Sequence, residues 1–322
     1  LTDAGLSLVE WRPLMGFLPP LSAAEWERVF ALYRSSPEYQ TYNAGMGLAA
    51  FKNIFWWEYI HRFSGRLIGL LFFIPFVYFL VKGRLTAGLT WRLAGLLVLG
   101  GLQGVIGWWM VKSGLTDRPD VSQYRLLVHL LLALVIMGML FHLALSVLVR
   151  PSQRVRVDKS LAAHAWLVVG LIVVTIAGGA LVAGTDAGQI YNSFPMMGDS
   201  LIPSEYGFLA PFWLNIFENP AAIQFNHRWL AVLTFIAIVA LWLRARQARL
   251  NKAAHAAVTT MLAIACIQVG LGISVLLTNV PIPLAAAHQA VAAVLLLNGI
   301  AVAFFVRARS YDERIAMQTI TA

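Results

Sequence analysis

Residues 125–149 read RLLVHLLLALVIMGMLFHLALSVLV, an apolar run without a single acidic residue. A helix that crosses the hydrocarbon core of a bilayer needs about 20 largely apolar residues, so this run predicts a membrane-spanning helix. Similar runs recur along the chain and predict six more spans, at 59–81, 91–112, 161–184, 226–243, 254–278 and 285–306.

The composition agrees with a membrane protein. Of the 322 residues, 59% are hydrophobic and 12% are charged, whereas soluble domains carry about 25% charged residues. The expected fold class is therefore an all-α integral membrane bundle. The single cysteine, Cys266, excludes an internal disulfide and any Cys-based zinc or iron–sulfur site. We expect its side chain to be small, apolar and buried.

The basic residues define the topology. They gather in four segments, at 82–92, 150–159, 244–252 and 307–314, each directly after an odd-numbered span. The positive-inside rule places these segments on the cytoplasmic or matrix side. Because the net charge of +9 is distributed in this way and forms no single patch, we expect no nucleic-acid partner.

The chain contains an internal repeat. Thr2–Gly5 (TDAG) recurs at 185–188, and His61-Arg62 recurs as His227-Arg228. Each His-Arg pair is followed by a glutamine, after 42 residues at Gln103 and after 41 at Gln268, and then by a histidine, His129 or His288. Both halves run in the same direction across the membrane.

The repeat predicts two domains, residues 1–150 and residues 151–322. In the second half a full span, 161–184, precedes the TDAG motif, and in the first half the chain begins at that motif. We therefore expect the chain to start after the first helix of a protein with eight spans in a four-plus-four arrangement. Gln103 and Gln268 are expected to form hydrogen bonds between helices, with contact to a bound ligand as the alternative.

Four histidines recur in register between the two halves: His61, His129, His227 and His288. All four are expected in the first turns of helices that run from the outer to the inner face, so they share one depth. A pair of imidazoles on facing helices can ligate heme iron, and two pairs suit two hemes. The alternative for each is an interfacial histidine that is hydrogen-bonded to a loop. His142, His164 and His255 lie outside this pattern and are expected to be structural.

Charged residues accompany the quartet. Glu58 lies three residues before His61, on nearly the same helical face. Arg62 and Arg228 follow the paired histidines, where they would meet anionic heme propionates or snorkel to lipid headgroups. Gln224 stands at the position equivalent to Glu58. This asymmetry indicates that one half performs chemistry and the other does not.

Several of these stretches together resemble one family. Residues 56–62 (WWEYIHR), 5–13 (GLSLVEWRP), 184–188 (GTDAG), 226–228 (NHR) and 287–289 (AHQ) are similar to heme A synthase of the alphaproteobacterial and mitochondrial type. The resemblance covers the whole chain apart from the expected missing helix. Some bacterial members carry a cysteine pair in an outer loop, which this chain lacks, so a thiol-based redox step is excluded.

The resemblance implies an oxidoreductase that acts on a methyl group. It implies conversion of heme O to heme A for cytochrome oxidase assembly, by two hydroxylations of the C8 methyl through an alcohol and a gem-diol. The first half would hold the substrate heme O through His61 and His129. The second half would hold a heme b cofactor, with its iron bound by His227 and His288. Glu58 matches the acid that the family needs for activity.

The resemblance also implies a setting. The chain would lie in the bacterial inner membrane, or in the mitochondrial inner membrane of a eukaryote, with heme O supplied by heme O synthase. A homo-oligomer is compatible with the sequence. The alternative function is a diheme cytochrome b that passes electrons from quinol, with two permanent hemes. The difference between Glu58 and Gln224 favours the enzyme.

Overall fold

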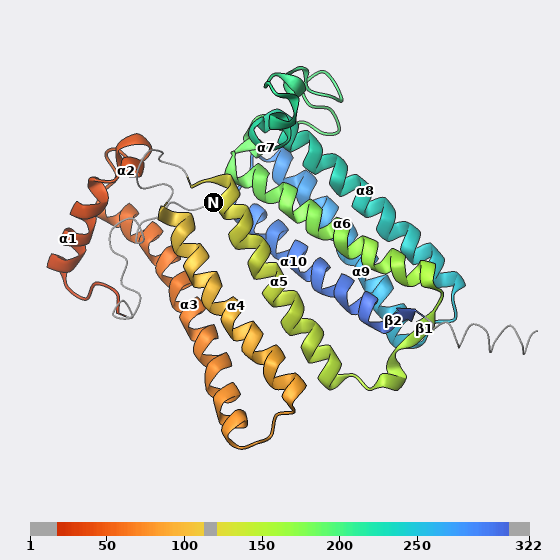
Figure 1. The fold of residues 1–322 in the computed structure, drawn as a ribbon. Helices are drawn as coiled ribbons and strands as arrows, with labels where there is room; N and C mark the ends of the chain where they lie inside the picture. Colours follow the sequence, from red (N-terminus) through yellow and green to blue (C-terminus); the bar gives the residue numbers. More distant parts are fainter. Residues whose placement is uncertain (1–17, 113–120, 309–322) are drawn as a thin grey trace, which may run out of the picture. The chain divides into compact units, whose positions relative to one another are not determined.

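The computed structural model describes residues 18–112 and 121–308 (Figure 1). The first TDAG copy, residues 5–13 and the loop around Asp117 lie outside this part of the chain. Within it, seven helices are long and apolar enough to cross a membrane, so the expected all-α integral membrane fold is confirmed. These helices are α3 (Leu48–Val81), α4 (Ala87–Lys112), α5 (Gln123–Leu148), α6 (Lys159–Gly184), α8 (Pro220–Gln247), α9 (Lys252–Leu277) and α10 (Ile282–Phe305).

The chain divides into two compact units, residues 1–136 and residues 137–322, with the division inside α5. The domain boundary at 150/151, which the repeat predicts, remains a prediction. In the first unit, α3 packs along α4, and two short helices, α1 (Ala23–Arg34) and α2 (Pro37–Thr41), precede α3.

The second unit is built around a ring of four helices. α6 packs on α8, α8 on α9, α9 on α10, and α10 back on α6. At the basic end of the ring, β1 (Val155–Val157) pairs in parallel with β2 (Val306–Ala308), with Arg156 opposite Arg307. This two-stranded ribbon joins the end of α10 to the segment between α5 and α6, and the apolar periodicity gave no sign of it. The short helix α7 (Asn215–Glu218) lies just before α8.

The start of α3 differs from the expectation. The helix begins at Leu48 and has 34 residues, about 51 Å of helix against a hydrocarbon core of about 30 Å. Its first turns carry Phe51 and Phe55, which are buried against Trp26, Phe30 and Tyr33. This aromatic cluster extends α3 beyond the apolar segment. His61 therefore lies thirteen residues into α3 and not in its first turn.

Cys266 also differs from the expectation, because its side chain is exposed on α9. It lies in the apolar part of a spanning helix, where the surrounding solvent is lipid and an exposed apolar side chain carries no penalty. Burial within the protein was therefore the wrong inference from an apolar sequence context.

The aromatic cluster yields a stability prediction. Phe51 is fully buried, and its ring stacks on that of Tyr33 with 5.0 Å between the centroids and 30° between the planes. Phe51→Ala should weaken the packing of α1 on α3 by about 3–5 kcal/mol, the usual cost of removing a buried Phe. Trypsin should then cleave after Arg28 and Arg34 much faster. Asn53→Ala, at an exposed position on the same helix, is the matched control, and equal cleavage of the two variants would refute the assignment.

Candidate functional site

The structure places the four recurrent histidines on four spanning helices. His129 lies in the second turn of α5, His227 in the second turn of α8 and His288 in the second turn of α10. Each of these helix ends is the one that the topology predicts to be outer. The three imidazoles are half-buried, whereas that of His61 is exposed on α3.

The histidines approach one another in the predicted pairs. Within the first unit, His61 is close enough to His129 to interact with it electrostatically. Within the second unit, His227 and His288 interact in the same way. Each pair therefore lies in one unit and joins two helices, as ligation of one iron by two imidazoles requires. Among the described residues there is no group of three or more His, Cys, Asp or Glu that could hold a metal ion.

Glycines face the three half-buried imidazoles. A Cβ atom built on Gly107, Gly179 or Gly272 would lie 3.0 Å from the Cε1 atom of His129, His227 or His288, respectively. Real Cβ atoms rarely come so close to another atom, so each imidazole fills a space that only glycine leaves open. The specific contact of each of these glycines is therefore a histidine ring.

Hydrogen bonds orient the imidazole of His227. Its Nδ1 lies 3.1 Å from the carbonyl oxygen of Thr175 on α6. A carbonyl can only accept, so Nδ1 carries the proton and donates, which leaves Nε2 with a free lone pair. A backbone carbonyl on one ring nitrogen is the usual means of fixing the other as a metal ligand.

Gln103 and Gln268 contact the other two half-buried histidines, His129 and His288. The Gln103 amide nitrogen donates to the His129 carbonyl oxygen at 3.0 Å and lies 3.2 Å from the ring Nδ1. The Gln268 amide nitrogen lies 3.4 Å from His288 Nε2. The expectation that these glutamines join two helices is confirmed. The His288 Nδ1 and the side-chain oxygens of both glutamines are buried without a partner in the described structure.

Glu58 and its counterpart in the second half, Gln224, make different contacts. In the first unit, Glu58 Oε1 lies 4.0 Å from Arg62 Nη1, and both side chains are 13% exposed. In the second unit, Gln224 is buried, donates to the Tyr191 carbonyl and accepts from Arg228. The same spacing thus produces an ion pair in one half and, in the other, a hydrogen bond from the Arg228 guanidinium to an uncharged amide.

Arg228 anchors the segment between α6 and α8, residues 185–219, which is called the outer segment. Its guanidinium donates to the carbonyl oxygens of Tyr191 (2.8 Å), Ser193 (2.9 Å) and Met196 (3.3 Å). Neither of the two roles considered from the sequence anticipated this arrangement. Its Nε is buried without a partner in the described structure, so one donor remains for a ligand.

A second contact stabilises the same outer segment. The Tyr191 hydroxyl donates to Glu205 Oε2 at 2.6 Å. This bond lowers the pKa of Glu205 and raises the pKa of Tyr191. Because a lowered carboxyl pKa stabilises the fold above the unfolded pKa, the contribution is lost as the pH falls through the folded pKa of Glu205.

Sequence reasoning missed several of these positions. Thr175 contributes a carbonyl oxygen, which carries no side-chain signature. For Gly107 and Gly272, sequence reasoning missed the contact with a histidine, which could have been found because each glycine lies four residues after the recurrent glutamine. The three remaining histidines have other surroundings. His164 Nδ1 lies 3.0 Å from Arg244, His142 packs on Phe304, and His255 begins α9.

The fold and site together define a class: a polytopic helical membrane protein with a pair of histidines in each of two repeated halves. Residues 1–300 match the sequence model of the cytochrome oxidase assembly protein family. The chain belongs to this family.

Relatives are similar along most of the chain. Heme A synthase of Rhodospirillum centenum is 48% identical over 92% of this chain and 79% of its own length. Those of Nitrosospira multiformis and Nitrosomonas eutropha are 46% and 47% identical, over 90% and 92% of this chain and 82% and 84% of their own lengths.

The glycine contacts yield a prediction within one helix. Gly272→Val should force the His288 ring out of its position and destabilise the protein by about 1–3 kcal/mol, the usual cost of overpacking. Gly270→Val is the matched control, because no atom lies within 4 Å of a Cβ at Gly270. Thermal unfolding in detergent measures both. Equal melting temperatures for the two variants would contradict the role assigned to Gly272.

Proposed function

We propose that this chain is a heme A synthase, an oxidoreductase that converts the C8 methyl of heme O to the formyl group of heme A. The methyl is hydroxylated twice, through an alcohol to a gem-diol that loses water. Each hydroxylation removes two electrons from the methyl carbon, and the reaction therefore requires an external electron acceptor. The observation that carries the proposal is the 46–48% identity to three heme A synthases over at least 90% of this chain. The product serves cytochrome oxidase assembly, in accord with the family.

The second unit fits a heme b cofactor. His227 has its proton fixed on Nδ1 by Thr175, so Nε2 is available to iron. His288 approaches it from α10, with a buried Nδ1 that has no partner in the described structure. Two neutral imidazoles between apolar helices suit a low-spin heme. When bound, heme b supplies one-electron redox chemistry, and the protein supplies the ligands and their orientation.

The first unit fits the substrate. His61 and His129 form the equivalent pair, and the exposed His61 ring leaves one side of the pair accessible to an exchangeable ligand. Substrate heme O must enter and heme A must leave. The difference in burial between the two pairs is consistent with one exchanged heme and one retained heme.

Glu58 is the proposed catalytic residue. It lies one helical turn before His61 and on nearly the same face. Its carboxylate, held near the Arg62 guanidinium, can accept a proton from water or stabilise positive charge at the oxidised carbon. Gln224 lacks an ionisable group and cannot do either.

Arg62 and Arg228 are proposed partners of the heme propionates. Arg228 keeps one buried Nε donor without a partner in the described structure, and Arg62 is mostly buried at the same position in the repeat. We further propose the bacterial inner membrane, or its mitochondrial equivalent, as the location, and heme O synthase as the supplier of heme O.

Glu58→Gln replaces the carboxylate with the same amide side chain that Gln224 provides in the second half. Cells that make heme O should then accumulate it, with heme A formation reduced at least about 100-fold, the scale of a lost general acid–base group. The bound heme b should remain. Glu27→Gln, on α1, is the control. Extraction of pigments with mass spectrometry measures the outcome, and normal heme A would refute the role of Glu58.

His227→Ala should remove the low-spin heme b spectrum from the purified protein, because one axial ligand is lost. His164→Ala, on α6, preserves both proposed ligands and should preserve the spectrum. An unchanged spectrum in the His227 variant would defeat the ligand assignment. Two fixed hemes b in the unmodified protein, with neither heme O nor heme A, would instead indicate the electron carrier.

A further inference from the structure

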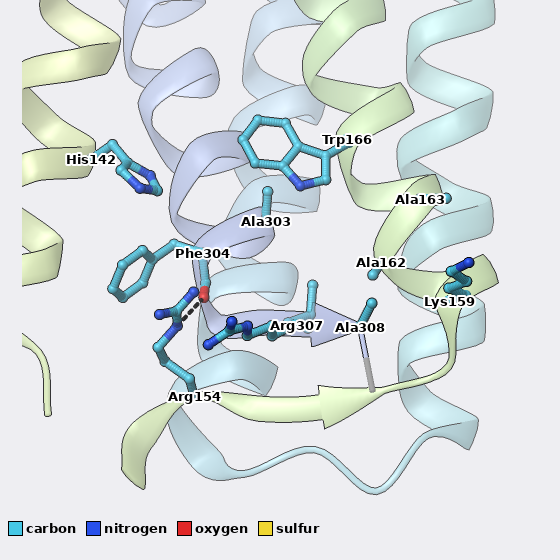
Figure 2. Close-up of a pocket in the computed structure, with 11 residues that line it drawn as sticks. His142, Arg154, Lys159, Ala162, Ala163, Trp166, Ala303, Phe304, Arg307 and Ala308 are labelled. Carbon is cyan, nitrogen blue, oxygen red and sulfur yellow. Dashed lines mark hydrogen bonds between the residues drawn. The ribbon is translucent and has the colours of Figure 1, made fainter. Parts of the chain in front are cut away.

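A cavity of about 410 Å³ opens at the basic end of the second unit, between α5, α6, α10 and the β1–β2 ribbon (Figure 2). This is the end that the charge bias predicts to be cytoplasmic, whereas His129, His227 and His288 lie near helix ends predicted to be outer. The lining combines cations with apolar side chains, and the proposed heme chemistry uses none of them.

The cavity is lined by three cations, Arg154, Lys159 and Arg307. None of its lining residues is acidic. Asp158 precedes Lys159 in the chain but is not part of the lining. Burial is the larger cause of the lowered pKa of Arg154, and the nearby charge of Arg307 lowers it further. The two guanidiniums therefore repel each other, and an anion between them would relieve that repulsion.

The position of Arg154 is fixed by the protein. Its Nε donates to the Phe304 carbonyl at 3.2 Å, and its Cζ lies 4.5 Å above the Phe304 ring, which is buried. Figure 2 shows this hydrogen bond, with Arg307 beside it. Since Nε is the anchoring donor, the Nη groups remain for a ligand. The β1–β2 ribbon holds Arg307 on the adjacent strand.

The deeper wall of the cavity is apolar and open. Trp166 lies seven residues beyond Lys159 on α6, about 10 Å further into the membrane, and 53% of it is exposed. Ala163 and Ala303 also line the cavity. The cations lie near the membrane surface and the exposed indole lies deeper in the membrane. This order matches that of the phosphate and the acyl chain in a lipid.

We propose that this cavity binds an anionic phospholipid, with its phosphate between Arg154, Lys159 and Arg307 and an acyl chain along Trp166. Basic pockets between spanning helices on the cytoplasmic side are suited to such headgroups. A soluble phosphate would use the cations alone and leave the apolar wall without a role.

Native mass spectrometry of the purified full chain tests the proposal. Phosphatidylglycerol should bind more tightly than phosphatidylcholine with the same acyl chains. Arg154→Gln with Arg307→Gln should weaken phosphatidylglycerol binding at least about tenfold, since each surface cation contributes appreciably to anionic lipid affinity. Arg84→Gln with Arg249→Gln removes the same charge from exposed positions elsewhere on basic segments and should change the affinity little.

Further measurements keep the test independent of folding. Lys159→Gln alters only an exposed cation and should weaken binding of phosphatidylglycerol, and Trp166→Ala should weaken both lipids. Equal affinity for the two lipids, or equal losses in the cavity variant and its charge-matched control, would overturn the proposal. Displacement of phosphatidylglycerol by millimolar inorganic phosphate would also overturn it, because the site would then recognise phosphate alone.

Discussion

An imidazole at membrane depth must satisfy two ring nitrogens where no water is available, and the rest of the candidate site follows from this constraint. A buried polar group without a partner is costly. His227 satisfies Nδ1 with the Thr175 carbonyl, and His129 lies beside the Gln103 amide. His288 retains a buried Nδ1 without a partner in the described structure. The bond to Thr175 leaves the Nε2 lone pair of His227 free, and iron is a natural partner for such a lone pair. The glycines supply the space that the rings need.

The two halves share one framework but differ at one ionisable position. The Gln-x-x-x-Gly spacing and the histidine that follows it recur in both. At the position of Glu58, however, the second half carries Gln224, which joins Arg228 in holding the outer segment to α8. A neutral amide suits a permanent hydrogen bond, whereas a carboxylate can exchange a proton. Under the proposed assignment, this one difference between the halves separates a half that retains its heme from a half that oxidises its heme.

Much of the fold could be predicted, because the length of each apolar run and the basic residues beside it can be read from the sequence alone. All seven spans lie where the hydrophobic runs lie. The start of α3 could not be predicted in this way, because Phe51 and Phe55 extend the helix by packing on α1, a tertiary effect. The β1–β2 ribbon joins residues about 150 positions apart and has only three pairs, too few for a periodic signal.

The site shows the same division. The four histidines were visible from their recurrence, and Glu58 from its replacement by Gln224 in the second half. The structure brings His227 toward His288 and His61 toward His129. The atoms that orient them were not visible, since a Thr175 carbonyl or a Gly179 hydrogen has no distinctive side chain. Under the proposed assignment, each histidine recurs because both halves need an iron ligand at that position. An orienting backbone atom is provided by any residue that keeps the helix in place, so its identity is free to vary between the halves.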